Sequence, residues 1–200
     1  MADKPVVFVF SRAPLYGAVK TRLAREIGAP ETLRFFRNSL VRTCKMLAVN
    51  SAYDVRLATT PTRQLLSVGL WPSGFKRVDQ GQGDLGRRMI RVLRTAHRVP
   101  TILVGSDIPQ AHSHHIVEAL TCLRRHAFVL GPVEDGGYWL IGAKSPDFLS
   151  PSVLDGVRWS TRFALSDTVD RLPGAAILKD RLFDIDDGAS FRRARSLNLI

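Results

Sequence analysis

The sequence contains few cysteines, no long hydrophobic run and no low-complexity segment. Cys44 and Cys122 are the only two cysteines among 200 residues, which argues against a disulfide framework and a cysteine metal site. The longest apolar runs, such as VVFVF and TILVG, have strand length and are far shorter than the roughly 20 residues of a membrane helix. MADKP at the amino terminus leads directly into an apolar run, without the hydrophobic region of a signal peptide. We therefore expect a cytoplasmic protein with no membrane partner.

Several catalytic motifs are also missing. The G-x-S-x-G sequence of serine hydrolases does not occur. His112, His114 and His115 lie close together without H-E-x-x-H spacing, so we expect an exposed first turn of a helix rather than a zinc site. The stretch SRAPLYGAVKTRL resembles a P-loop, but Val19 stands where that motif needs a glycine before its Lys-Thr pair. A Walker-type phosphate cradle is therefore excluded.

Positive charge is in excess, with a formal net charge of +11. Basic residues crowd into residues 12–45 and again into RRMIRVLR, residues 87–94. Three interpretations remain open: nucleic-acid binding, a solvated basic surface, or a basic rim that attracts small anionic substrates. No zinc-finger spacing, RNA-recognition motif or long basic tail supports the first, so we expect no specific nucleic-acid partner.

Strand-like apolar runs alternate with segments of helical period, which predicts an α/β fold. We expect three layers, α/β/α, with a mostly parallel central sheet in a single domain spanning residues 1–200. The best central strand is TILVGS, because a continuous apolar run suits a strand covered on both faces. Other expected elements are a strand at Val6–Phe10 and helices at Glu31–Val49, Asp84–His97, Ser113–Leu123 and Ser160–Leu172, the last capped by Ser160.

Candidate binding residues follow two of the expected strands. Lys20 and Arg22 stand in the loop after the first strand, from which their side chains can reach a phosphate. Asp107 follows the most buried strand, where open α/β sheets bind ligands, and its carboxylate suits Mg²⁺. A solvated loop and a turn-capping aspartate are the structural alternatives. A second acidic cluster, FDIDDG, places Asp184 and Asp186 on one side of an extended segment, unless it is simply a solvated acidic loop.

Two glycine-rich stretches are further candidates. In GPVEDGGYWLIG, Gly136 and Gly137 allow a sharp turn and a close approach to a ligand, with Glu134 and Asp135 at its mouth. An ordinary hairpin would explain the Asp-Gly pair but not the gathering of two acids and two aromatic residues. In QGQGDLGRRM, Gly83 and Asp84 stand where a helix begins, and such a turn can present backbone N–H groups to a base or a phosphate.

Five motifs together resemble a known superfamily. FSRAPLYGAVKTRL, QGQGDLGRRM, VGSDIP, GPVEDGGYWLIG and DIDD occur in the order and approximate spacing of a group of bacterial proteins assigned to the glycosyltransferase-A (GT-A), or nucleotide-diphospho-sugar transferase, superfamily. The resemblance covers essentially the whole chain. In outline it extends to the 2-phospholactate guanylyltransferases and, more distantly, to the molybdenum-cofactor guanylyltransferases. The opening loop lacks the Gly-Gly pair typical of many nucleotidyltransferases, and Asp187 stands where relatives commonly have Thr.

The resemblance implies a role for each matching residue. The phosphates of a nucleotide would be held by Arg12, Lys20 and Arg22, and the nucleoside would lie near Gly83 and Asp84. A divalent cation, Mg²⁺ or Mn²⁺, would be bound by Asp107 and Asp186. The acceptor side would be formed by Glu134, Asp135, Gly136 and Gly137. Lys20, Asp107 and Asp135 are the catalytic candidates.

The leading hypothesis is Mg²⁺-dependent nucleotidyl transfer. A small anionic acceptor would attack the α-phosphorus of a nucleoside triphosphate, and catalysis would consist of positioning and charge neutralisation. The alternative on the same fold is glycosyl transfer from a nucleotide sugar, with Glu134 or Asp135 as the base. A hypothesis of another class is a nucleotide- or nucleic-acid-binding protein without catalysis, motivated by the net charge.

Overall fold

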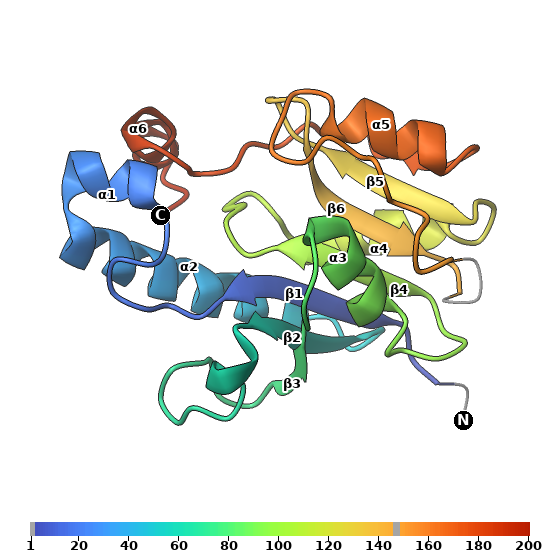
Figure 1. Ribbon diagram of the computed structural model, residues 1–200, viewed down its shortest axis with the longest axis horizontal. Coiled ribbons are helices and arrows are strands. Elements are labelled where there is room, and N and C mark those ends of the chain that lie inside the picture. The colour runs from blue at the N-terminus through green and yellow to red at the C-terminus, as the bar shows by residue number, and fades with distance from the viewer. Residues whose placement is uncertain (1–2, 146–148) are drawn as a thin grey trace.

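The computed structural model describes residues 3–145 and 149–200, and it confirms the α/β fold and the mostly parallel sheet (Figure 1). Seven strands form one sheet in the order β3-β2-β1-β4-β6-β5-β7. Among these strands β6 is antiparallel to both neighbours, β4 and β5, while the other neighbouring pairs are parallel. The strands are β1 (Val6–Arg12), β2 (Asp54–Thr60), β3 (Lys76–Asp79), β4 (Thr101–Gly105), β5 (Phe128–Pro132), β6 (Tyr138–Ala143) and β7 (Ala176–Ile177).

Helices lie on both faces of the sheet and at one end of it. α2 and α4 pack against one face, and α3 packs against the other face together with the chain around α5. No helix within residues 3–145 and 149–200 combines the length and the apolar character needed to cross a membrane. The helices are α1 (Thr21–Ile27), α2 (Ala29–Ala48), the 3₁₀ turn η1 (Thr62–Gln64), α3 (Leu85–Leu93), α4 (Ser113–Cys122), α5 (Ala164–Arg171) and α6 (Gly188–Ser196).

The apolar runs form central strands because side chains on both faces of the sheet are buried. In β1, Val7 and Val9 belong to the core under α2 and α4, whereas Val6 and Phe8 belong to the core under α3. All four side chains are at most 2% exposed. Successive side chains of a strand point to opposite faces, so a strand covered on both sides needs a continuous apolar run.

A third apolar cluster joins α1 to α6 beyond the end of the sheet (Figure 1). Phe35 and Phe191 meet edge to face with ring centroids 5.2 Å apart. The backbone N–H of Gly188, the first residue of α6, donates a hydrogen bond to Glu26 of α1 at 2.8 Å. A Cβ atom at position 188 would collide with that carboxylate, so the glycine lets α6 approach without displacing the Glu26 side chain. The segment before α6 is thereby held next to the loop before α1.

Two local expectations differ from the structure. Residues 21–27 form a helix of their own, α1, which no predicted element covered. The helix expected at Ser160–Leu172 begins later, at Ala164, with Phe163 and not Ser160 at its N-cap. Ser160 has a φ of 58°, a left-handed conformation incompatible with the extended backbone typical of a cap residue. The expected capping role of Ser160 was therefore wrong.

Candidate active site

One cleft lies where the carboxyl ends of the parallel strands meet. Its volume is about 600 Å³. Arg12 at the end of β1, Gln80 after β3 and Asp107 after β4 all line it. Lys20 and Arg22 reach the same cleft from the loop after β1 and from the start of α1. The carboxyl ends of parallel strands share one edge of the sheet, which is where open α/β sheets bind their ligands.

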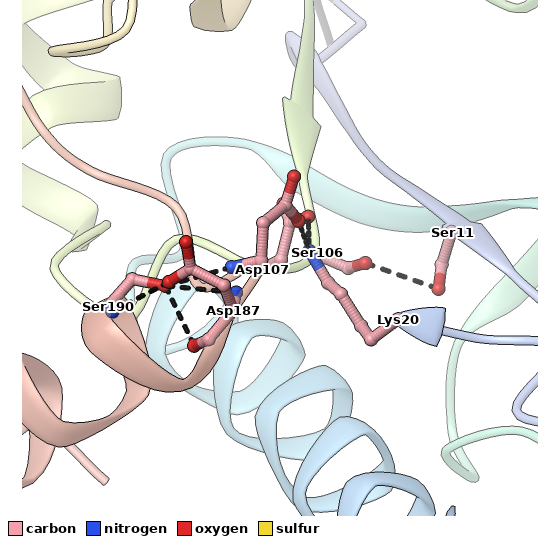
Figure 2. Close-up of polar contacts among 7 residues, drawn as sticks. Ser11, Lys20, Ser106, Asp107, Asp187 and Ser190 are labelled. Carbon is pink, nitrogen blue, oxygen red and sulfur yellow. Dashed lines mark hydrogen bonds and ion pairs between the residues drawn. The ribbon is translucent and has the colours of Figure 1, made fainter. Parts of the chain in front are cut away.

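Three carboxylates converge at this end of the sheet, and two of them, Asp107 and Asp186, line the cleft. Asp107, Asp184 and Asp186 each place an oxygen within 4.8 Å of the others, although Asp107 is far from the other two in sequence. The ammonium group of Lys20 forms ion pairs with both Asp107 and Asp186 (Figure 2 shows the contact with Asp107). The sequence-based pairing of Asp107 with Asp186 is thus matched by their positions, and Asp184 joins them as a third acid.

The electrostatics of this group show a site that attracts positive charge. Burial by itself would lower the pKa of Lys20, but Asp107 and Asp186 outweigh that effect and raise the pKa above its usual value. Burial raises the pKa of Asp184 to about 6, and the negative charges of Asp186 and Asp107 act in the same direction. One ammonium group therefore leaves the three carboxylates incompletely neutralised.

Local backbone features hold these groups in place. Lys20 is the N-cap of α1 and adopts a left-handed conformation, with a φ of 46°. The hydroxyl of Ser106, next to Asp107, donates to the hydroxyl of Ser11 in β1 at 3.2 Å (Figure 2). The backbone N–H of Ile185 donates to the carbonyl of Asp107 at 3.3 Å, which ties the two acidic segments together.

Asp187 differs from its acidic neighbours because it caps α6. Its carboxylate accepts a hydrogen bond from the backbone N–H of Ser190 at 2.9 Å, and Ser190 returns its hydroxyl to the same carboxylate at 2.8 Å (Figure 2). A threonine can also fill an N-cap position, so the departure from Thr at this site leaves the capping geometry available. Asp187 therefore belongs to the helix terminus rather than to the three converging acids.

The wall of the cleft is rich in cations. Arg12, Arg22 and Arg88 line it together with Lys20. Burial and the nearby Arg12 both lower the pKa of Arg88, and its Nε atom is buried without a hydrogen-bond partner in the described part of the chain. Sequence analysis missed Arg88, although its position one turn into the helix after the glycine-rich stretch was a usable signal. The arrangement favours an anionic ligand.

Three of the predicted site residues, Gly83, Asp84 and Glu134, are not among the described residues that line the cleft. Asp84 is the N-cap of α3, where its carboxylate accepts from the backbone N–H of Arg87 at 2.8 Å. Glu134 forms a bidentate ion pair with Arg193 of α6, with one N–O distance of 2.8 Å. Their expected contacts with ligands stay predictions.

The turn between β5 and β6 borders a second, adjoining cavity. This cavity measures about 370 Å³. Asp135 and Gly137 line it, as do Asp107 and Asp184. Gly136 has a φ of 90°, a conformation that favours glycine. The expected acceptor-side residues Asp135 and Gly137 therefore lie beside the three carboxylates, whereas Glu134 turns toward α6.

The histidines differ from the exposed helical turn that the sequence suggested, because His115 is buried. Its Nδ1 atom accepts the backbone N–H of His112 at 3.1 Å, which places the ring proton on Nε2, 3.3 Å from the carboxylate of Asp180. A protonated Nε2 offers no lone pair to a metal ion. Although His114, His115 and Asp180 come within 4.8 Å of one another, this hydrogen bonding favours a structural role.

His115 gives a testable pH dependence of stability. Burial, and then the neighbouring His114, lower its pKa below the usual value, against the opposing charge of Asp180. As the pH falls below about 6.5, His115 therefore binds a proton more readily in the unfolded chain than in the folded chain. This effect lowers the free energy of unfolding in urea between pH 7.5 and pH 5.5, whereas the raised pKa of Asp184 acts in the opposite direction. We therefore expect His115→Asn to lose less stability, or gain more, than the wild type between these two pH values. An equal pH dependence of the free energy of unfolding in the wild type and in His115→Asn would contradict the assignment.

Solved structures of transferases share this fold. A protein from Desulfovibrio desulfuricans G20, provisionally assigned as a nucleotide-diphospho-sugar transferase, is 27% identical, with a TM-score of 0.82 over 98% of this chain and 94% of that one. CMP:2-keto-3-deoxy-manno-octonic acid synthetase in complex with CTP is 13% identical, with a TM-score of 0.59 over 98% of both chains. The 2-C-methyl-D-erythritol 4-phosphate cytidylyltransferase of Thermus thermophilus is 15% identical, with a TM-score of 0.56 over 99% of this chain and 100% of that one. The fold is therefore that of the GT-A-like nucleotide-diphospho-sugar transferases and nucleotidyltransferases.

The sequence also matches a protein family. Residues 43–161, more than half of the chain, match the family described as "Uncharacterized protein conserved in bacteria (DUF2064)". The chain belongs to this family. No protein of curated function matches it in sequence.

Proposed function

We propose that the protein is a transferase that takes a group from a nucleotide donor with the help of a divalent cation. The observation that carries this proposal is the convergence of Asp107, Asp184 and Asp186 next to Lys20, with Lys20, Asp107 and Asp186 lining a cleft that arginines also line. A nucleotide diphosphate or triphosphate is an anion that needs such positive charge around it. The GT-A-like fold supports the same assignment.

The three carboxylates suit Mg²⁺ or Mn²⁺. Both are hard cations that prefer carboxylate oxygen ligands and retain positions for substrate phosphates. The contacts of Lys20 with two of the acids mark this position as one where a cation is stabilised. When bound there, the metal would neutralise charge on the donor's phosphates and on the leaving group. A related fold, glucosyl-3-phosphoglycerate synthase of Mycobacterium tuberculosis, was solved with Mn²⁺ and UDP.

The chain's own residues supply binding and orientation in this scheme. Arg12 and Arg22 hold the donor's phosphates from the two sides of the loop after β1. Arg88 adds a partly buried guanidinium whose Nε is available to an acceptor oxygen. Lys20 lines the same cleft, so its ammonium group is a counter-charge within reach of both the carboxylates and a bound phosphate.

Nucleotidyl transfer is the first candidate reaction. An oxygen of the acceptor forms a bond to the α-phosphorus of a nucleoside triphosphate, and pyrophosphate leaves with the electron pair of the broken P–O bond. A phosphate or carboxylate acceptor is already ionised, so no side chain has to remove a proton. The cationic cleft supports this reaction because its positive charges attract the three negatively charged phosphates of the donor.

Glycosyl transfer from a nucleotide sugar is a second candidate, favoured by the position of Asp135. An acceptor hydroxyl forms a bond to the anomeric carbon, a nucleoside diphosphate leaves, and the hydroxyl proton passes to a carboxylate. Asp135 lines the adjoining cavity with Asp107 and Asp184, where such a hydroxyl would bind. Release of pyrophosphate from a nucleoside triphosphate, or of a nucleoside diphosphate from a nucleotide sugar, separates the two reactions.

Thermal unfolding with nucleotides tests the donor. We expect one nucleoside triphosphate or nucleotide sugar to raise the melting temperature by about 5–10 °C in the presence of MgCl₂, because a ligand at 100 times its dissociation constant adds about 2.7 kcal/mol. Without the divalent cation the shift should shrink. Arg88→Gln should reduce the shift, and Arg63→Gln, in the 3₁₀ turn η1, is the matched control. A panel that gives no shift with either Mg²⁺ or Mn²⁺ would overturn the proposed function.

A further inference from the structure

The cleft and the adjoining second cavity differ in the charge of the residues that line them. Arginines and Lys20 surround the cleft, as described above. The lining of the second cavity contains Asp107, Asp135 and Asp184, and among the residues that the structure describes there it has no Lys, Arg or His. An anion in this cavity would therefore face three carboxylates without a cation of the cavity wall to offset them.

Asp135 keeps the cavity acidic even when a metal ion neutralises the other acids. Asp107 and Asp184 belong to the group that suits a divalent cation, whereas Asp135 is outside it. One oxygen of Asp135 accepts the backbone N–H of Gly137 at 2.9 Å, which orients the carboxylate at the turn. An ionised carboxylate is purely a hydrogen-bond acceptor, so its natural partners are hydroxyl groups or cations.

Aromatic rings form the rest of the wall. Tyr138 and Trp159 line the cavity, with their ring planes at 70° to one another and ring centroids 6.4 Å apart. Trp159 is absent from the described lining of the cleft, so its ring serves the second cavity only. An aromatic face beside a carboxylate suits a ligand with an apolar face and a hydroxylated edge.

Two glycine-rich motifs of the sequence build this aromatic wall. A Cβ atom at Gly86 in α3 would lie 2.7 Å from the Trp159 ring. A Cβ atom at Gly136 would lie 2.2 Å from the backbone oxygen of Arg162. The backbone N–H of Leu165 also donates to the carbonyl of Gly136 at 3.0 Å. These glycines allow the segment 159–165 to close directly over α3 and over the turn between β5 and β6.

Ser160 is held in a conformation that L-residues rarely adopt. Its φ is 58°, and it lines both the cleft and the second cavity. Such a conformation persists only where the surrounding structure fixes it. The segment 159–165 is therefore a fixed wall at the boundary of the two cavities, well suited to hold a second substrate next to the first.

We propose that the second cavity binds the acceptor, and that this acceptor is an uncharged molecule with several hydroxyl groups, of the sugar or polyol class. Its apolar face packs on Trp159, and a hydroxyl donates a hydrogen bond to Asp135. This inference rests on the proposed function for the identity of the site as an acceptor site. It replaces the anionic acceptor of the nucleotidyl-transfer scheme with a neutral one, because the lining supplies carboxylates where an anion would need cations. A neutral hydroxyl acceptor must lose its proton, so this inference favours the second candidate reaction, glycosyl transfer.

Matched pairs of probes test the proposal. Neutral hexoses and their 6-phosphates are offered to the Mg²⁺-loaded protein, and binding is followed by saturation-transfer NMR and titration calorimetry. We expect at least one hexose to bind and its 6-phosphate to bind at least tenfold more weakly. Asp135→Asn should weaken hexose binding about fivefold or more, and Trp159→Ala should abolish it. Trp159→Phe should retain part of it, and Asp155→Asn, outside both cavities, should change nothing.

The sign of the Asp135→Asn effect decides the class of acceptor. If the cavity holds an anion, removing this negative charge will strengthen binding of the 6-phosphate, and that result would overturn the inference. Binding of the phosphates in preference to the hexoses, or of no probe at all, would overturn it too. Nucleotide-induced thermal shifts should be the same in Trp159→Ala as in the wild type. If nucleotides give no thermal shift with the wild-type protein, the proposed function itself is wrong.

Discussion

Replacing Asp107 by Asn is expected to lower the rate of group transfer at least about 1,000-fold, equivalent to about 4 kcal/mol of transition-state stabilisation. The variant removes a negative oxygen ligand from the three converging acids, and it also removes one of the two ion pairs of Lys20. A weakened cation site neutralises the charge that develops on the leaving group less well. The measurement is steady-state turnover of the donor found by thermal shift, together with the affinity for Mn²⁺ by calorimetry.

Asp187→Asn is the matched control for that variant. Asp187 lies directly beside Asp186 in sequence, but its carboxylate caps α6. Asn is as good an N-cap residue as Asp, so stability and turnover should both stay near the wild-type values. If Asp107→Asn binds Mn²⁺ as tightly as the wild type does, the acids do not form a metal site. If its turnover also matches that of Asp187→Asn, Asp107 has no part in the reaction.

Gly136→Ala is expected to destabilise the fold by about 3 kcal/mol or more, a loss at the upper end of ordinary single substitutions. Two causes add up. The backbone has a φ of 90°, where an L-residue is strained, and the new Cβ would lie 2.2 Å from the carbonyl oxygen of Arg162. A backbone atom cannot swing aside as a side chain does, so the segment 159–165 has to move. Urea unfolding followed by circular dichroism gives the free energy.

Gly174→Ala separates the two causes. Gly174 has a φ of 75°, but nothing lies within 4 Å of a Cβ atom built there. This variant should therefore lose only the conformational part, about 1–2 kcal/mol. A Gly136→Ala variant as stable as Gly174→Ala would show that the turn between β5 and β6 does not pack tightly against Arg162. It would also weaken the case for a fixed wall around the second cavity.

Much of the fold was predictable because the strongest signals are local. The apolar runs at β1 and β4 become central strands, and the sharp turn expected in GPVEDGGYWLIG is present between β5 and β6. The helix expected at Glu31–Val49 spans Ala29–Ala48. The start of α5 was harder to predict. Its boundary depends on packing of residues 159–163 against α3 and the β5–β6 turn, and local propensity does not report such contacts.

Candidate-site residues that follow directly on strands were predictable from the sequence. Residues whose side chains can contact either a ligand or another part of the protein were less predictable. Asp107 and Lys20 follow β4 and β1, whose carboxyl ends must share one edge of a parallel sheet. The structural contact of Glu134 is with Arg193, 59 residues away in sequence, and that of Asp84 is the cap of α3. The expected ligand contacts of both residues stay predictions, but local sequence does not reveal a contact such as that with Arg193.

By itself, the sequence determined the α/β class, the positions of the central strands and the set of charged residues after them, because hydrophobic periodicity and strand-end placement act over short distances. The tertiary structure alone decided which of those charges meet. It brought Asp184 and Asp186 from the far end of the chain to Asp107, where the backbone N–H of Ile185 donates to the carbonyl of Asp107. The tertiary structure also shows why positions 86 and 136 favour glycine. A Cβ atom at either position would collide with the segment 159–165, and only packing in three dimensions reveals such contacts.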